Sequence, residues 1–223
     1  MEPFDYGVDI YTEADSHDDT LANLGPLRPL AGIWTSHKGT DIHPVGPGSD
    51  TTGPVIDNDE HNVFVEHYEL HPIDRQTNGP QLFYGLRYHT HIVKPGEVET
   101  FHDQVGYWLW EPAARRVLLS LAIPRGQVAL AAGTADADAT EFEVSATLGS
   151  ETFGILSNPF LDHAFRTVSF RMQVLVHEDG TWSYEQHTQM RIPDRAGLVD
   201  HVDRNTMKRI GEPTPNPLAP GIG

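Results

Sequence analysis

Short runs of apolar and aromatic residues, several of them alternating with polar ones, recur along most of this chain. The runs cover residues 62–70, 82–93, 99–110, 116–123, 127–132, 141–146, 166–176, 182–190 and 199–210. Residues 166–176 show the alternation most clearly, with Phe170, Met172 and Val174 on one face. The Asp-Gly pair that ends residues 177–180 is a strong hairpin signal. A period of two predicts β-strands throughout this region.

The segments between and before these runs predict turns and loops. Residues 30–34 (LAGIW) start the first strand, after a short helical turn in residues 18–24 that Gly25-Pro26 ends. From Gly39 to Pro54, glycine and proline predict a long loop or lid. Turn residues predict a break over residues 71–80, and residues 149–163 are expected to be irregular, with at most a one-turn helix.

The spacing of the predicted strands indicates the fold class. About ten strands follow one another with one or two short helices, which is typical of an all-β sandwich or barrel. We expect one domain over residues 18–210, a flexible leader over residues 1–17 and a flexible tail over residues 211–223. An antiparallel barrel of this size can hold one small ligand.

Composition narrows the classes of partner. The formal net charge of −17 repels phosphate backbones, so we expect no nucleic-acid partner. No apolar run reaches the roughly 20 residues that span a bilayer, and the start carries no secretory signal. The chain has no cysteine, which excludes disulfides and thiolate metal sites. A cytoplasmic protein is the simplest expectation.

Trp34 follows a glycine at the start of the first predicted strand. Such a tryptophan can close one end of a barrel, with a late basic residue stacked on it. Arg209 is the candidate, and the contact would contribute on the order of 1 kcal/mol. The alternative, that Trp34 is simply a large core residue, is equally compatible with the pattern.

The thirteen histidines include two groups with potential for chemistry. His89 and His91 share one face of a strand, because side chains repeat every second residue. With His67, His71 or His102 they could form a three-histidine metal site. Solvated surface histidines are the favoured interpretation of this group.

The second candidate is His201, near the start of the last predicted strand. Alternation places it on one face with Asp203, Asn205 and Met207. This face is mixed in polarity, so the pattern alone does not establish that His201 points inward.

Four segments in order resemble the nitrobindin-type haem-binding β-barrels, also described as fatty-acid-binding-protein-like. They are residues 30–34 (LAGIW), 39–44 (GTDIHP), 101–108 (FHDQVGYW) and 201–209 (HVDRNTMKR). Together they span most of the chain, from about residue 27 to residue 210. The resemblance implies a ten-stranded antiparallel up-and-down barrel of the lipocalin kind.

The resemblance also implies a function. His201 would be the axial ligand of a haem b iron, and His43 and Val45 would contribute to the same cofactor site. The small-molecule ligands would be haem and nitric oxide or peroxynitrite, with peroxynitrite isomerisation as the conceivable activity. No catalytic residue is assigned from the sequence, and the resemblance is compatible with a homodimer.

This chain departs from the family pattern near the distal side of the expected pocket. Ser36 and Lys38 replace glycines, His43 replaces a tyrosine, and Val45 replaces a threonine. The longer segment 46–59 indicates a longer bacterial subgroup. Two alternatives therefore stay open beside haem binding: a haem-free carrier of fatty acid or another small apolar ligand, and a metalloenzyme built on His89 and His91.

Overall fold

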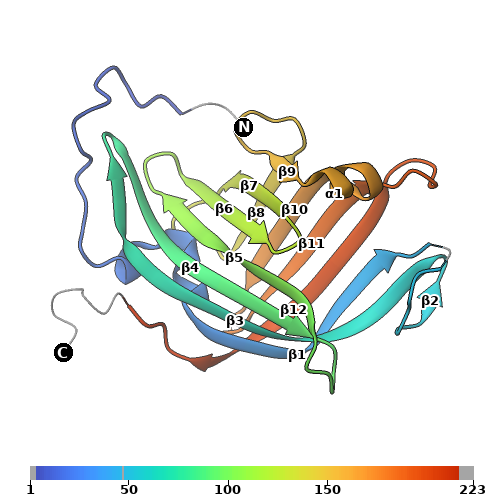
Figure 1. Ribbon diagram of the computed structural model, residues 1–223. Helices are drawn as coiled ribbons and strands as arrows, with labels where there is room; N and C mark the ends of the chain where they lie inside the picture. The colour runs from blue at the N-terminus through green and yellow to red at the C-terminus, as the bar shows by residue number, and fades with distance from the viewer. Residues whose placement is uncertain (1–3, 47, 216–223) are drawn as a thin grey trace.

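The chain folds into a closed antiparallel barrel in a computed structural model that describes residues 4–46 and 48–215 (Figure 1). The barrel strands are β1 (Gly32–Pro44), β3 (Asp59–Asn78), β4 (Gln81–Val93), β5 (Thr100–Glu111), β6 (Arg116–Ile123), β7 (Gln127–Thr134), β8 (Glu141–Thr147), β10 (Arg166–Val176), β11 (Trp182–Arg191) and β12 (Val199–Gly211). Two short strands lie outside this ring: β2 (Val55–Ile56) pairs with β3, and β9 (Ile155–Ser157) pairs with β7.

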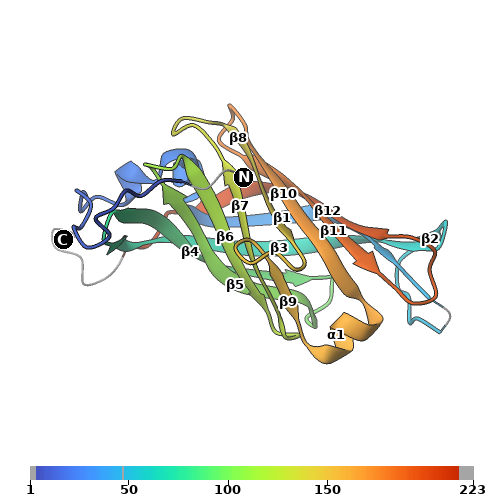
Figure 2. The same cartoon turned by 90° about the horizontal axis from the view of Figure 1, so that it is seen from above.

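Strand order follows the chain, as expected for an up-and-down barrel. The sheet runs β1-β12-β11-β10-β8-β7-β6-β5-β4-β3, and β1 also pairs with β3, which closes the ring. The sequence-based expectation of a ten-stranded antiparallel barrel is therefore confirmed. The helices are the 3₁₀ turns η1 (Leu21–Asn23) and η2 (Gly25–Leu30) and the short α1 (Pro159–Ala164). Figure 2 shows the strands wrapped around one interior.

Large aromatic side chains fill the half of the interior near η1 and η2. Trp34, Trp108 and Trp182 are almost completely buried, and Trp34 meets Trp182 edge to face with ring centroids 6.0 Å apart. Such aromatic pairs add about 1 kcal/mol beyond the area they bury. This end of the barrel is thus closed by packed side chains.

Trp34 is held at the closed end of the barrel by contacts with Leu30 and Arg209. Its indole N–H donates to the carbonyl of Leu30 at 2.8 Å, and the Arg209 guanidinium lies 4.4 Å from its ring centroid. Arg209 also donates to the carbonyl of Ala31 at 2.6 Å. Gly32 sits at φ +145°, and a Cβ there would meet the guanidinium at 2.5 Å, so the Gly-x-Trp motif makes room for this stack. The predicted Trp34–Arg209 contact is confirmed.

Replacing Arg209 tests how much this stack stabilises the barrel. Arg209→Ala removes a cation–π contact and hydrogen bonds to two backbone carbonyls, so we expect a loss of about 2 kcal/mol in the free energy of unfolding. Urea denaturation followed by tryptophan fluorescence measures it. Arg209→Lys is the matched control and should retain part of the stability, because it keeps the charge but loses the planar fork. A loss below about 0.5 kcal/mol for Arg209→Ala would contradict the expected role.

The predicted loop after Trp34 is wrong in its first part. β1 continues to Pro44, with a bulge between Ser36 and Gly39 where its register against β3 shifts. Gly39 belongs there because a Cβ would lie 2.1 Å from the ring of Phe64. A glycine that served close packing was interpreted as a loop residue.

The predicted turn over residues 71–80 is also shorter than expected. β3 continues to Asn78, and the hairpin occurs at Gly79-Pro80. Pro72 is tolerated inside the strand because β1 pairs with β3 only as far as Leu70, so Pro72 has one strand neighbour. Residues 149–163 contain β9 and the start of α1, and η2 continues beyond Gly25-Pro26.

The described part of the leader contacts the barrel. The hydroxyl of Tyr6 donates to Glu111 at 2.5 Å, the amide of Ala14 donates to the carbonyl of Gly79, and that of His17 donates to Tyr84. Of the predicted tail, residues 216–223 lie outside the described residues. Across residues 4–46 and 48–215, no helix has the length and apolar character that crossing a membrane would require.

Candidate functional site at the barrel mouth

The end of the barrel opposite Trp34 carries a cluster of polar side chains. β1 reaches this mouth with Asp41 and His43, and β12 begins there with His201. The two strands are neighbours, and Asp41 lies opposite Asp203 in the ladder. Alternation then places Asp41, His43, His201 and Asp203 on the inner face, with the buried residues further along each strand.

Asp41 joins the two histidines. Its Oδ1 lies 2.6 Å from His201 Nε2, and its Oδ2 lies 2.6 Å from His43 Nδ1. The imidazole centroids are 5.7 Å apart, and one potential ligand atom from each residue falls within 4.8 Å of the others. We call Asp41, His43 and His201 the mouth triad.

Neighbouring side chains hold the mouth triad in this arrangement. Glu60 Oε2 lies 3.4 Å from His43 Nε2, and the Asn62 amide donates to Asp41 Oδ2 at 3.3 Å. Glu60 is itself fixed by the backbone amides of Thr52 and Gly53, at 2.9 and 2.7 Å. Such outer partners set the orientation of a metal-binding imidazole.

Carboxylates control protonation in the mouth triad. Burial alone would lower the pKa of His201, but Asp203 and Asp41 outweigh it and raise this pKa to about 10. Burial of Asp41 acts to raise its pKa, but its hydrogen bonds with His201 and His43 prevail and hold the pKa of this carboxyl well below its usual range. Asp41 and His201 therefore form an ion pair near neutral pH.

A buried carboxyl lies deeper in the barrel. Glu66 on β3 accepts hydrogen bonds from Thr90 at 2.7 Å, Tyr184 at 2.8 Å and Asn205 at 2.6 Å. Burial raises the pKa of Glu66 above its ordinary value despite these donors. This network lies between the mouth and the aromatic floor and makes the middle of the barrel polar.

The structure unites two of the predicted site residues and leaves the third at the rim. His201 and His43 belong to the mouth triad, while Val45 comes directly after β1, where its amide donates to the carbonyl of Asn58 at 3.1 Å. Asp41 and Glu60 were missed by sequence reasoning. The Asp-x-His spacing at 41–43 was the available signal, but it was hidden by the interpretation of this segment as a loop.

The alternative of a three-histidine metal site around His89 and His91 has no support among the described residues. His89 is exposed and pairs with Asp103 at 2.9 Å, and His91 contacts Thr100 at 3.0 Å. Within the described ranges, the mouth triad is the group of histidines and acids that could hold a metal ion. His89 and His91 are surface histidines, whereas burial lowers the pKa of His102 on the adjacent strand β5.

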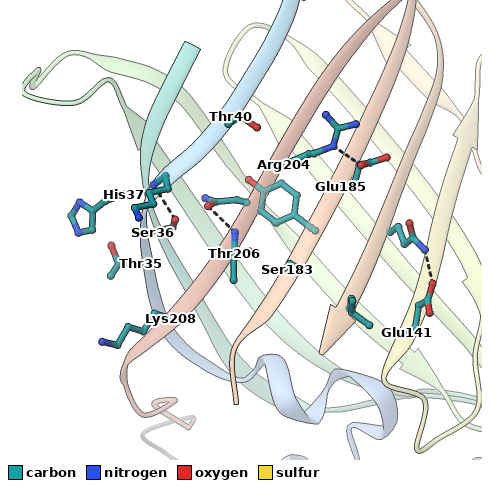
Figure 3. A pocket seen from close by; sticks show the side chains of 15 residues that line it. Thr35, Ser36, His37, Thr40, Glu141, Ser183, Glu185, Arg204, Thr206 and Lys208 are labelled. Atoms are coloured by element: carbon teal, nitrogen blue, oxygen red, sulfur yellow. Dashed lines mark hydrogen bonds and ion pairs between the residues drawn. The ribbon is translucent and has the colours of Figure 1, made fainter. Parts of the chain in front are cut away.

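Two hollows show where there is room for a ligand. A hollow of about 30 Å³ reaches the interior below the mouth, between inward side chains such as Gln104, Phe170 and Thr188. A wide groove of about 700 Å³ lies along the wall where β1 and β12 lose their pairing between residues 35 and 40 (Figure 3). Its one histidine is His37, which is exposed, so the groove lacks the donor set found at the mouth.

Comparison with known proteins identifies the family. The family model described as the THAP4-like, heme-binding beta-barrel domain matches residues 23–209 of this chain. The chain belongs to this family. The matched region runs from the 3₁₀ turns through β12, and the resemblance to nitrobindin-type haem-binding barrels is thereby confirmed. Binding of haem is the general property of the family.

A solved structure shows the same fold. The chain is similar to the protein of the crystal structure of Rv2717c from M. tuberculosis, with a TM-score of 0.56 and 18% identity over 84% of this chain and 97% of that one. At this identity the likeness concerns the fold. No curated protein sequence matches this chain significantly.

The mouth offers an imidazole, a side chain that haem iron binds. His201 lies on the inner face, and Nδ1 of its ring has no hydrogen-bond partner among the described residues. His201 would hold the iron through one imidazole nitrogen, and Asp41 would accept a hydrogen bond from the other.

Proposed function

We propose that this member of the heme-binding β-barrel family binds haem b at the barrel mouth with His201 as axial ligand. The observation that carries the proposal is the hydrogen bond of 2.6 Å between His201 and the buried Asp41. A carboxylate on a ligating imidazole fixes its orientation and increases its basicity. The absence of cysteine agrees with a non-covalent haem, because thioether attachment needs cysteines.

Haem iron bound at this site would supply a coordination position for a small ligand, nitric oxide or peroxynitrite. This chain's residues would shape that position. His43, 26% exposed and linked to Glu60 and Asp41, lies beside His201 and could donate a hydrogen bond to a bound anion. Val45 adds an apolar side chain at the rim. His43 stands where the family pattern has a tyrosine, so this mouth is more polar than the mouth that the family pattern implies.

The alternative of a haem-free carrier of fatty acid has less support. An acyl chain needs a long apolar cavity, since ligand pockets usually measure about 300–1,000 Å³. The interior hollow measures about 30 Å³, and Glu66 with its partners occupies the middle of the barrel. The hollow between Gln104, Phe170 and Thr188 is therefore far smaller than such a ligand needs.

Titration of the purified protein with haemin tests the proposal. We expect the Soret absorption to shift and to saturate at one haemin per chain, with an affinity in the micromolar range or tighter. Quenching of tryptophan fluorescence gives a second readout. A spectrum that remains that of free haemin, or that never saturates, would contradict specific haem binding and would reopen the carrier hypothesis.

A further inference from the structure

We propose that the mouth triad also binds a bare divalent transition-metal ion of the Zn²⁺ or Fe²⁺ class when haem is absent. Asp41, His43 and His201 would each supply one ligand. This inference does not rest on haem binding, because it follows from how the three side chains converge. Two histidines and one carboxylate are a known ligand set for zinc and for non-haem iron.

The positions of the donor atoms are close to those that an ion needs. Asp41 is 2.6 Å from each imidazole, and one donor atom of each residue falls within 4.8 Å of the others. Bonds of about 2.1 Å to an ion separate neighbouring ligand atoms by about 3.0–3.4 Å. Donor atoms that lie up to 4.8 Å apart would therefore close by about 1–2 Å to bind the ion, through changes in side-chain position. The pairing of β1 with β12 at Asp41 and Asp203 holds the two strands that carry the ligands side by side.

The surroundings supply the outer contacts of a metal site. The second nitrogen of His43 faces Glu60 at 3.4 Å and supplies such a contact, whereas Asp203 lies 3.5 Å from His201 Nε2, the nitrogen that faces Asp41. Asn62 donates to Asp41 Oδ2 and would restrain the carboxylate when its other oxygen binds the ion. Outer carboxylates on ligating histidines are a regular feature of protein metal sites.

The charge around the mouth triad favours a cation. The site contains three carboxylates, those of Asp41, Glu60 and Asp203. The positive charge beside them comes from Lys94, which lies 3.8 Å from Glu60. Metal ions bind imidazole in its neutral form, so a bound ion would take the place of protons on the ligating nitrogens. The ion then compensates the excess negative charge of the site.

Three protein ligands leave open positions on the ion. Water or a small anionic substrate could occupy them, as in metal sites that carry out chemistry. The bare ion and haem iron would both require His201, so each should exclude the other from this chain. The site would then hold either haem or a bare metal ion, but not both.

Metal titration of the haem-free, chelator-treated protein tests the inference. We expect calorimetry with Zn²⁺, and anaerobically with Fe²⁺, to show one ion per chain, and Co²⁺ to give the visible absorption of a nitrogen- and oxygen-ligated ion. His43→Ala and Asp41→Asn should each weaken Zn²⁺ binding at least 100-fold. His89→Ala, which changes an exposed histidine pair, is the matched control and should bind like the wild type.

The outcomes separate this inference from haem binding. Zn²⁺ binding without a specific haemin complex would support the metal site and contradict the proposed function. A haemin complex without Zn²⁺ binding would support the proposed function and contradict the metal site. Unchanged Zn²⁺ affinity in folded His43→Ala, checked by circular dichroism, would overturn the assignment, as would an equal loss in His89→Ala. Zn²⁺ should also reduce haemin binding in a concentration-dependent way.

Discussion

His201→Ala is expected to weaken haemin binding by more than about 100-fold, the upper end of what loss of an outer-shell partner costs at a metal site. The substitution removes the proposed axial ligand and leaves Asp41, with its low pKa, without the imidazole that compensates its charge. Haemin titration followed at the Soret maximum measures the affinity. Alanine removes a side chain that is 30% exposed, so the fold should persist.

Two further variants make the result specific. His89→Ala should leave haemin affinity unchanged, because His89 is exposed on the outer face and pairs with Asp103. His43→Ala should change the spectrum of bound ligands more than the haemin affinity, because His43 is proposed to act beside the iron. Wild-type affinity in His201→Ala together with a large loss in His43→Ala would show that the axial ligand had been assigned to the wrong histidine.

Glu66→Ala is expected to have the largest effect on stability, a loss of about 3–5 kcal/mol in the free energy of unfolding. The carboxyl is almost fully buried and accepts hydrogen bonds from Thr90, Tyr184 and Asn205. Each donor left without an acceptor costs about 1–3 kcal/mol, and a cavity forms in addition. Urea denaturation at pH 6 measures the effect. A loss below about 1 kcal/mol would mean that water replaces the carboxyl.

Glu66→Gln keeps the shape of the side chain and tests its protonation. Because burial raises the pKa of Glu66, its stabilising contribution is complete below the unfolded-state pKa near 4.5 and is lost as pH rises through the higher folded-state pKa. Glutamine does not ionise, so the variant should gain stability relative to the wild type as pH rises from about 4.5 towards neutrality. A difference that is independent of pH would show that Glu66 is ionised in the folded protein throughout this range.

Much of the barrel could be predicted from the sequence, because alternation and turn residues are local signals. The predicted limits of β6 and β10 agree with the structure to the residue. The same local signals failed where tertiary packing decides the backbone. Gly39 predicts a loop but makes room for Phe64, and Pro72 predicts a turn but lies on a stretch of β3 with one strand neighbour.

The candidate site was only half predictable. His201 and His43 could be named from the family pattern, but their connection through Asp41 could not, because it depends on the pairing of β1 with β12 across about 160 residues. The buried position of Glu66 was equally hidden, since a charged residue in an alternating strand gives no sign that three partners satisfy it. The sequence therefore predicted the two histidines of the mouth triad and missed the carboxylates that position them.

Chemical rescue of His201→Gly with imidazole tests the central claim most directly. The variant opens a space where the ligand side chain was, and free imidazole can enter it and bind iron while Asp41 accepts from its other nitrogen. We predict that His201→Gly binds haemin weakly, and that imidazole restores the wild-type Soret maximum and affinity in a saturable way. Wild-type haemin binding by His201→Gly without imidazole would contradict the account.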